Sequence, residues 1–176
     1  VDITGLSALS IVVKSASGNI SLNNMGVIGD TTLKSTSGDV TAALKAGVMF
    51  RAESTSGKIM TRIGGKVVAA ETKSASGNVS LIVDDIGRIS AQSSSGTLEL
   101  DVRGKAEFID AHSVSGSVKL RLAEDTTGFL MTAKSLSGTV KCEFPSSVIG
   151  DQYTFGDGST KINLKSTSGK VHAFGA

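Results

Sequence analysis

The residues of this sequence that could do acid–base chemistry are few and do not converge. Acidic side chains stand next to each other only at 84–85 and 124–125, and each pair lies near a predicted glycine corner. Paired carboxylates could cleave a polysaccharide if they flanked the scissile bond. Because the two pairs fall at different phases of the repeat that organises the chain, we expect solvated turn residues and predict no catalytic residue.

The sequence also lacks the elements of a metal or nucleophilic site. His112 and His172 occupy different positions of the repeat, and Cys142, the only cysteine, occupies an inward position. These three residues cannot supply a four-ligand zinc site, and we expect Cys142 to be a buried, inert thiol. No Gly-x-Ser-x-Gly elbow and no phosphate-binding glycine loop is present. The sequence therefore predicts no enzyme, no metal and no cofactor.

The charged group that does recur is the ammonium of lysine, always four residues before the glycine of a repeated tetrad. This lysine column consists of Lys14, Lys34, Lys73, Lys134 and Lys165. Glu53, Gln92 and His112 take the same position in the other repeats. A basic strip of this kind could bind an anionic envelope polymer or lipid head groups. The alternative is a solvated face that discourages aggregation between sheets.

The repeated tetrad is Ser-x-Ser-Gly, and it occurs eight times. Its glycines are Gly18, Gly38, Gly57, Gly77, Gly96, Gly116, Gly138 and Gly169. They are separated by 20, 19, 20, 19, 20, 22 and 31 residues. A fixed period of this length is typical of repeat architectures, in which stacked units share one core.

Aliphatic residues alternate with polar ones on both sides of each tetrad. The second residue after the glycine is always aliphatic, as in Ile20 and Val79, and the seventh and fifth residues before it are mostly apolar. This alternation predicts a half-buried strand on each side of a Ser-Gly corner. Extending the alternation into the tetrad places both of its serines on the inner face.

The repeat predicts an all-β chain folded as a single parallel β-solenoid (β-helix) of about eight coils, each of about 20 residues. An antiparallel meander would not explain why one residue type recurs at one phase, whereas stacked coils bring each position next to its own copy. The eight tetrad glycines are the expected structural corners because glycine tolerates the positive φ of a tight turn.

We expect one domain over 1–176, with Ser-x-Ser-Gly coils in 1–143, a loop or cap insertion in 144–160 and a final coil in 161–176. The insertion holds the only proline and the only tyrosine of the chain. Val1 and Ile3 match the second and fourth positions after a missing glycine, so we expect the chain to begin inside a coil.

Composition narrows the classes of function. The chain is 39% hydrophobic but only 4% aromatic, and its net charge of +2 argues against a dedicated nucleic-acid binder. No apolar run approaches the length of a transmembrane helix, and no signal-peptide pattern is present. We expect no nucleic-acid partner and no transmembrane segment in this sequence.

Repeated [TS]-x-S-G-[ND]-[VI]-x-[LA] units and the closing segment 156–171 (GDGSTKINLKSTSGKV) resemble the bacterial DUF4097 family. The resemblance spans nearly the whole chain. It implies a β-solenoid, often associated with the cell envelope and described as an adhesin, with no established catalytic activity and no functional residues to carry over.

Together these features predict a non-catalytic structural or adhesive module at the bacterial cell envelope, or outside the cell, held by an upstream anchor that this sequence lacks. Expected partners are an envelope polymer, a glycan or another protein. The alternative is a protein-binding scaffold on the cytoplasmic or membrane-proximal side that self-associates through open coil ends. A polysaccharide-acting enzyme is a distant third.

Overall fold

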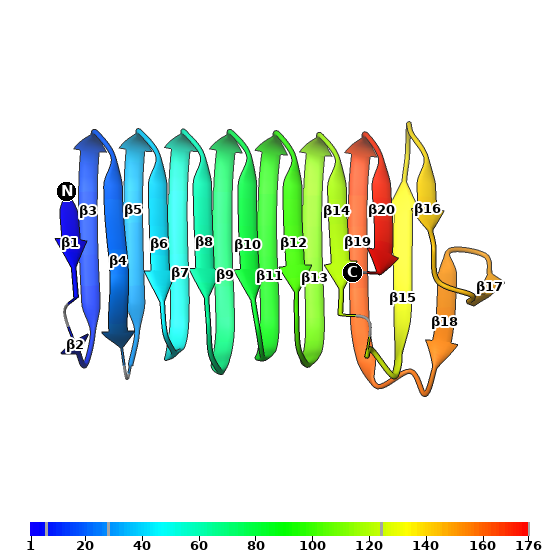
Figure 1. Ribbon diagram of the computed structural model, residues 1–176. Helices are drawn as coiled ribbons and strands as arrows, with labels where there is room; N and C mark the ends of the chain where they lie inside the picture. The colour runs from blue at the N-terminus through cyan, green and yellow to red at the C-terminus, as the bar shows by residue number, and fades with distance from the viewer. Residues whose placement is uncertain (6, 28, 124, 176) are drawn as a thin grey trace.

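A computed structural model describes residues 1–5, 7–27, 29–123 and 125–175 and contains two long sheets joined by corners (Figure 1). The post-corner sheet has the order β1 (Asp2–Thr4), β4 (Ile20–Val27), β6 (Val40–Leu44), β8 (Ile59–Ile63), β10 (Val79–Val83), β12 (Leu98–Val102), β14 (Val118–Leu122), β20 (Val171–Gly175) and β16 (Val140–Cys142), with β2 (Ser7–Ala8) beside β4. The pre-corner sheet has the order β17 (Ser147–Ile149), β18 (Gln152–Gly156), β15 (Gly128–Ser135), β19 (Thr160–Ser168), β13 (Ala106–Ser115), β11 (Ile86–Ser95), β9 (Val67–Ser76), β7 (Gly47–Ser56), β5 (Thr31–Ser37) and β3 (Ile11–Ser17). No membrane-spanning helix occurs among these described residues.

Successive coils run parallel and in register, so each repeat position lies beside its own copy. In the post-corner sheet Val79 lies between Ile59 and Leu98, and in the pre-corner sheet Lys34 lies between Lys14 and Glu53. Parallel pairing without a crossover helix requires that the chain return to the same edge after each turn, as a solenoid does. The prediction of an all-β parallel β-solenoid is confirmed.

The last coil is not last in space. Six coils, from β3–β4 to β13–β14, follow one another in sequence order, and β19 and β20 then lie between that array and the coil of β15 and β16 (Figure 1). The predicted number of about eight coils is therefore slightly too high for a regular stack. Only six coils are consecutive, and the segment between the seventh and eighth tetrads reverses the order of the last two.

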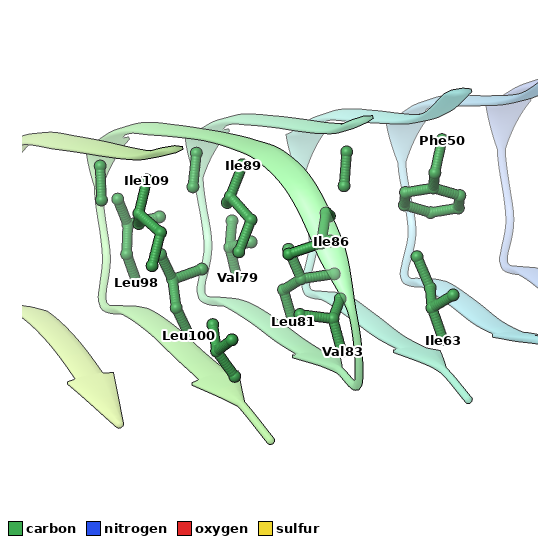
Figure 2. Packing of buried hydrophobic residues seen from close by; sticks show 14 of the residues in the cluster. Phe50, Ile63, Val79, Leu81, Val83, Ile86, Ile89, Leu98, Leu100 and Ile109 are labelled. Carbon is green, nitrogen blue, oxygen red and sulfur yellow. The ribbon is translucent and has the colours of Figure 1, made fainter. Parts of the chain in front are cut away.

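The core consists of files of aliphatic side chains enclosed between the two sheets. Ile89 and Ile109 from the pre-corner sheet face Val79, Leu81, Leu98 and Leu100 from the post-corner sheet, all buried (Figure 2). Each such side chain contributes about 1.5–3 kcal/mol by leaving water. The sheets lie close together because the other inward positions hold small residues, which also explains why the core needs no tryptophan.

The two serines of each tetrad face different environments, which corrects the expectation that both lie inside. The first serine is buried in six of the eight tetrads, as in Ser54 and Ser113, whereas the second serine is exposed in all eight, as in Ser56. At the corner the chain crosses from one sheet to the other. The second serine therefore has no facing strand to cover it.

The first serine of several tetrads and the tetrad glycines bring the corners of neighbouring coils into contact. The hydroxyl of Ser166 donates a hydrogen bond to the carbonyl of Gly116 at 2.8 Å, and that of Ser135 donates to Gly169 at 2.7 Å. Gly77 has φ +141°, and a Cβ built on it would lie 2.1 Å from the carbonyl oxygen of Gly57. A side chain is therefore excluded both by backbone conformation and by the stacked corner beside it.

The segment between the last two coils closes one end of the solenoid. β18 pairs antiparallel with β15, and β17 pairs antiparallel with β18. Phe129 of β15, Phe155 of β18 and Phe144 form an aromatic cluster, with ring centroids 5.1–5.5 Å apart. The antiparallel pair thus covers the edge that β15 would otherwise expose to other chains.

Candidate binding groove

The lysine column lies on the outer face of the pre-corner sheet, one side chain per coil. The ladder registers place its members in the spatial order Lys14, Lys34, Glu53, Lys73, Gln92, His112, Lys165 and Lys134. The five predicted lysines are therefore on one face, with Lys165 between His112 and Lys134. The side chains of this column are exposed or half-exposed.

A groove runs along this column, perpendicular to the strands. Over the first six coils it has a volume of about 860 Å³. A second hollow of about 280 Å³, which shares His112 with the first, is lined by Lys134 and Lys165. The lysine column forms one wall, and the first serine of the tetrads forms most of the floor. The other wall, which we call the small-residue wall, consists of Ala16, Thr36, Thr55, Ala75, Ser94, Val114, Thr167 and Leu136.

The groove has this shape because the tetrad places a long side chain and a short one on the same outer face. The strand's alternation directs the fourth and second residues before the glycine outward and the serine between them inward. The corner then turns the chain away just after the small-residue wall. Repetition of this local geometry from coil to coil converts a shallow notch into a groove over the first six coils and a second hollow over the other two.

Carboxylates compensate part of the positive charge. The ammonium of Lys34 lies 2.8 Å from Glu53, and that of Lys134 lies 2.8 Å from Asp151 of the β17–β18 connection. Among the residues that line the groove, the five lysines therefore face only these two carboxylates. An excess of positive charge remains along the channel.

Glu71 lies outside the groove and holds one of the lysines in place. Its carboxylate is 2.8 Å from the ammonium of Lys73 and 2.7 Å from the guanidinium of Arg51. The hydrogen bond from Lys73 lowers the pKa of Glu71 below its ordinary value of 4.5; burial opposes this shift, and Arg51 adds to it. Glu71 is therefore ionised at neutral pH.

The other residues singled out for possible chemistry are dispersed. Asp85 lies at a glycine corner, where its carboxylate accepts a hydrogen bond from the backbone N–H of Lys105 at 2.8 Å. Of the second acidic pair, Asp125 is described and Glu124 lies outside the described residues. His112 lines the groove, whereas His172 lies on the post-corner sheet, 3.0 Å from Glu143. No group of three or more potential metal-ligating side chains occurs within the described ranges.

Cys142 departs in two ways from the expected buried thiol beside Leu120. It is only half-buried on the edge strand β16, where the hydroxyl of Ser146 lies 3.8 Å from its sulfur. Its neighbour in register is Ala173, because β20 separates β16 from β14.

Sequence reasoning found the lysine wall but missed the groove and the role of Asp151. The small-residue wall was visible in the sequence as a recurring position, since six of its eight members are alanine, serine or threonine. The depth of the groove between this wall and the lysines depends on the geometry of the corners, which the sequence does not reveal. Asp151 belongs to the segment that has no repeat phase, so no pattern could place it beside Lys134.

The geometry defines a class of protein: a parallel β-solenoid whose one outer face carries a groove of repeated side chains. The sequence model of the family described as Toastrack DUF4097 matches residues 10–173. The chain belongs to this family, as the resemblance of its tetrads indicated. Comparison with curated proteins found no match, and comparison with solved structures found none either.

Proposed function

We propose that this β-solenoid is a non-catalytic structural or adhesive module of the bacterial cell envelope that binds an extended ligand through many repeated contacts. The observation that carries the proposal is the groove along the first six tetrads, which is followed by a second hollow at the other two and presents equivalent positions in each coil. A repeated surface of this kind suits a ligand that itself repeats.

Rigidity supports binding over many weak contacts. Each strand of the lysine wall is hydrogen-bonded to a neighbouring coil, and the corners add backbone bonds such as Gly77 N–H to the Ser95 carbonyl at 3.0 Å. The side chains of the groove are thus held at fixed intervals before a ligand arrives. Preorganisation lowers the entropy that binding must offset, and linked contacts add to an avidity that no single contact provides.

The placement of the acidic residues favours binding over catalysis. Polysaccharide-cleaving enzymes need two carboxylates that face each other across the substrate. In the groove, Glu53 and Asp151 are separated by several coils, and each is paired with a lysine. Each of these carboxylates holds an adjacent ammonium in position.

Binding to envelope material tests this function directly. The purified chain would be applied to an array of bacterial envelope polymers and glycans, and retention compared with that of Thr55→Trp, in which a bulky side chain fills the groove. We expect retention on at least one polymer and its loss in the variant. An array on which the chain binds nothing, or binds equally well with the groove filled, would refute a binding role for this face.

Localisation is a separate part of the proposal and needs a separate test. Fractionation of cells that express the natural gene, followed by detection of the chain in envelope and cytoplasmic fractions, would separate the envelope module from the cytoplasmic scaffold. We expect the envelope fraction, and exclusive recovery with soluble cytoplasmic markers would favour the alternative.

A further inference from the structure

We infer that the groove binds a linear polyanion that lies along the solenoid axis and carries carboxylate or phosphate groups at short, regular intervals. This inference rests on the proposed function, because it names the ligand of the same groove. Four observations carry it: the excess charge, the length of the lysine wall, the chemistry of the opposite wall and the contrast with the other sheet.

Charge selects an anion. Five lysines and two carboxylates line the groove, and Lys14 and Lys165 form no ion pair with any carboxylate of the described residues. The ion pair between Lys34 and Glu53 leaves the Lys34 side chain 42% exposed, and Lys134 is 55% exposed beside Asp151. These ammonium groups therefore remain accessible to a second anion.

The length of the lysine wall selects a polymer. Seven inter-strand steps separate Lys14 from Lys134, and at about 4.8 Å each they span about 34 Å. A single exposed ion pair is weak in water, so a free monovalent anion gains little at any one lysine. A chain of anions that reaches several lysines binds through their combined attraction.

The small-residue wall fits a hydroxylated or phosphorylated chain better than a nucleic acid. The hydroxyls of Thr36, Thr55 and Ser94 are exposed beside the lysines and can donate hydrogen bonds to oxygen atoms. No phenylalanine, tyrosine or tryptophan is present among the residues that line the groove. Binding of single-stranded nucleic acid usually depends on aromatic rings on which the bases stack.

The outer face of the post-corner sheet shows the contrast. There, charges of opposite sign lie in adjacent coils and pair with each other: Lys119 lies 2.8 Å from Glu99, and Arg121 lies 4.0 Å from Asp101. A hollow of about 310 Å³ on that face is lined by two cationic and two anionic side chains, which include Lys119 and Glu99, and it holds no run of lysines. The groove on the pre-corner sheet therefore differs from this hollow by its excess of positive charge.

The test measures the affinity of the intact chain for four probes: polygalacturonate, inorganic polyphosphate, single-stranded DNA and uncharged dextran. We expect binding to one or both polyanions, with the carboxylate and phosphate arms showing which source is preferred, and no binding to dextran. Affinity should rise with the length of galacturonate oligomers and fall when NaCl is raised from about 50 to about 500 mM.

Two charge-matched triple variants locate the site. Replacing Lys14, Lys34 and Lys73 by Gln should weaken polyanion binding by about a factor of two to three per lysine, hence about tenfold. The control replaces Lys45, Lys66 and Lys105, which lie in the loops between sheets at the opposite edge, and should change affinity less than twofold. All six side chains project from the surface, so circular dichroism should show that both variants are folded.

The outcomes separate this inference from the function on which it rests. Equal losses in the two triple variants, or tighter binding to single-stranded DNA than to either polyanion, would overturn the inference. If the chain were retained only on uncharged envelope polymers, and both triple variants bound them as well as the wild type does, the polyanion inference would be wrong. The proposed binding function would still stand. An absence of binding to every probe and every array polymer would overturn both.

Discussion

A side chain is excluded from the stacked glycine corners for two reasons, the left-handed backbone conformation and the close approach of a neighbouring coil. Three glycines allow the cost of each reason to be measured. Gly77 combines a φ of +141° with a Cβ position 2.1 Å from the carbonyl oxygen of Gly57 in the preceding coil. Gly116 has the close approach, 2.0 Å, without a left-handed φ, and Gly150 has a φ of +59° with no atom within 4 Å. Alanine substitutions at these three positions measure the effects of backbone conformation and of close approach separately and in combination.

The expected costs follow from these geometries. Gly150→Ala should lower the free energy of unfolding by about 1 kcal/mol, the cost of a left-handed residue. Gly116→Ala must push two coils apart by about an ångström, weakening backbone bonds worth about 1 kcal/mol each, so we expect about 2–3 kcal/mol. Gly77→Ala combines that displacement with backbone strain of about 1–3 kcal/mol, for a total of about 4 kcal/mol.

Urea unfolding followed by far-ultraviolet circular dichroism measures these differences as shifts of the midpoint. Repeat proteins can unfold in more than one step, so hydrogen exchange at the corner amides would locate the loss. If Gly77→Ala and Gly116→Ala cost no more than Gly150→Ala, the neighbouring corners are not in contact and the stacking described above is wrong.

Three further perturbations test the core, the ion pairs and the cap. Thr72 is fully buried between Ala52 and Ala91, and its hydroxyl has no hydrogen-bond partner in the structure. Thr72→Val should therefore raise the free energy of unfolding, measured by chemical denaturation, by about 1 kcal/mol. A lower free energy of unfolding in this variant would mean that the hydroxyl does form a hydrogen bond. The pKa of Glu71 is lowered in the folded state, so its carboxylate contributes to the free energy of unfolding, by at most about 1 kcal/mol. This contribution is fully present above pH 4.5 and is lost as the pH falls through the pKa that Glu71 has in the folded protein. Glu71→Gln should therefore be less stable than the wild type at pH 7 and equal to it in strong acid, and a difference that does not change with pH would contradict this. Phe144→Ala removes the edge-to-face contact with Phe129 and should lower the free energy of unfolding by about 2 kcal/mol. The substitution should accelerate hydrogen exchange more in β18 than in β9, and an equal acceleration in both strands would argue against a local cap.

The sequence could predict the features that repeat. The inward positions are held by residues such as Ile89 and Leu98 because burial between two sheets requires apolar side chains, and the alternation reveals them without a structure. The lysine column followed from the same parity, since an unpaired ammonium must face water. The same alternation wrongly predicted that the second serine of each tetrad faces inward, because the strand ends there and no facing strand covers the side chain.

The order of the last two coils could not be predicted from the repeat. The tetrads around Gly138 and Gly169 carry nearly the same residues, so either coil could stack on β13 and β14 as far as side-chain type is concerned. The choice depends on the segment 144–160, which has no repeat phase and folds as the antiparallel pair β17–β18. Its aromatic cluster and Asp151 therefore became visible only in the structure.

Disulfide trapping within the lysine column tests the stacked arrangement most directly. In a Cys142→Ser background, cysteines replace His112 and Lys165, which are neighbours in register, or His112 and Lys134, which are separated by β19. A disulfide requires Cα atoms within about 7 Å, whereas two inter-strand steps amount to about 9.6 Å. We expect mild oxidation to crosslink the first pair and leave the second reduced. Crosslinking of His112→Cys with Lys134→Cys, and not with Lys165→Cys, would contradict this arrangement of the coils and with it the groove.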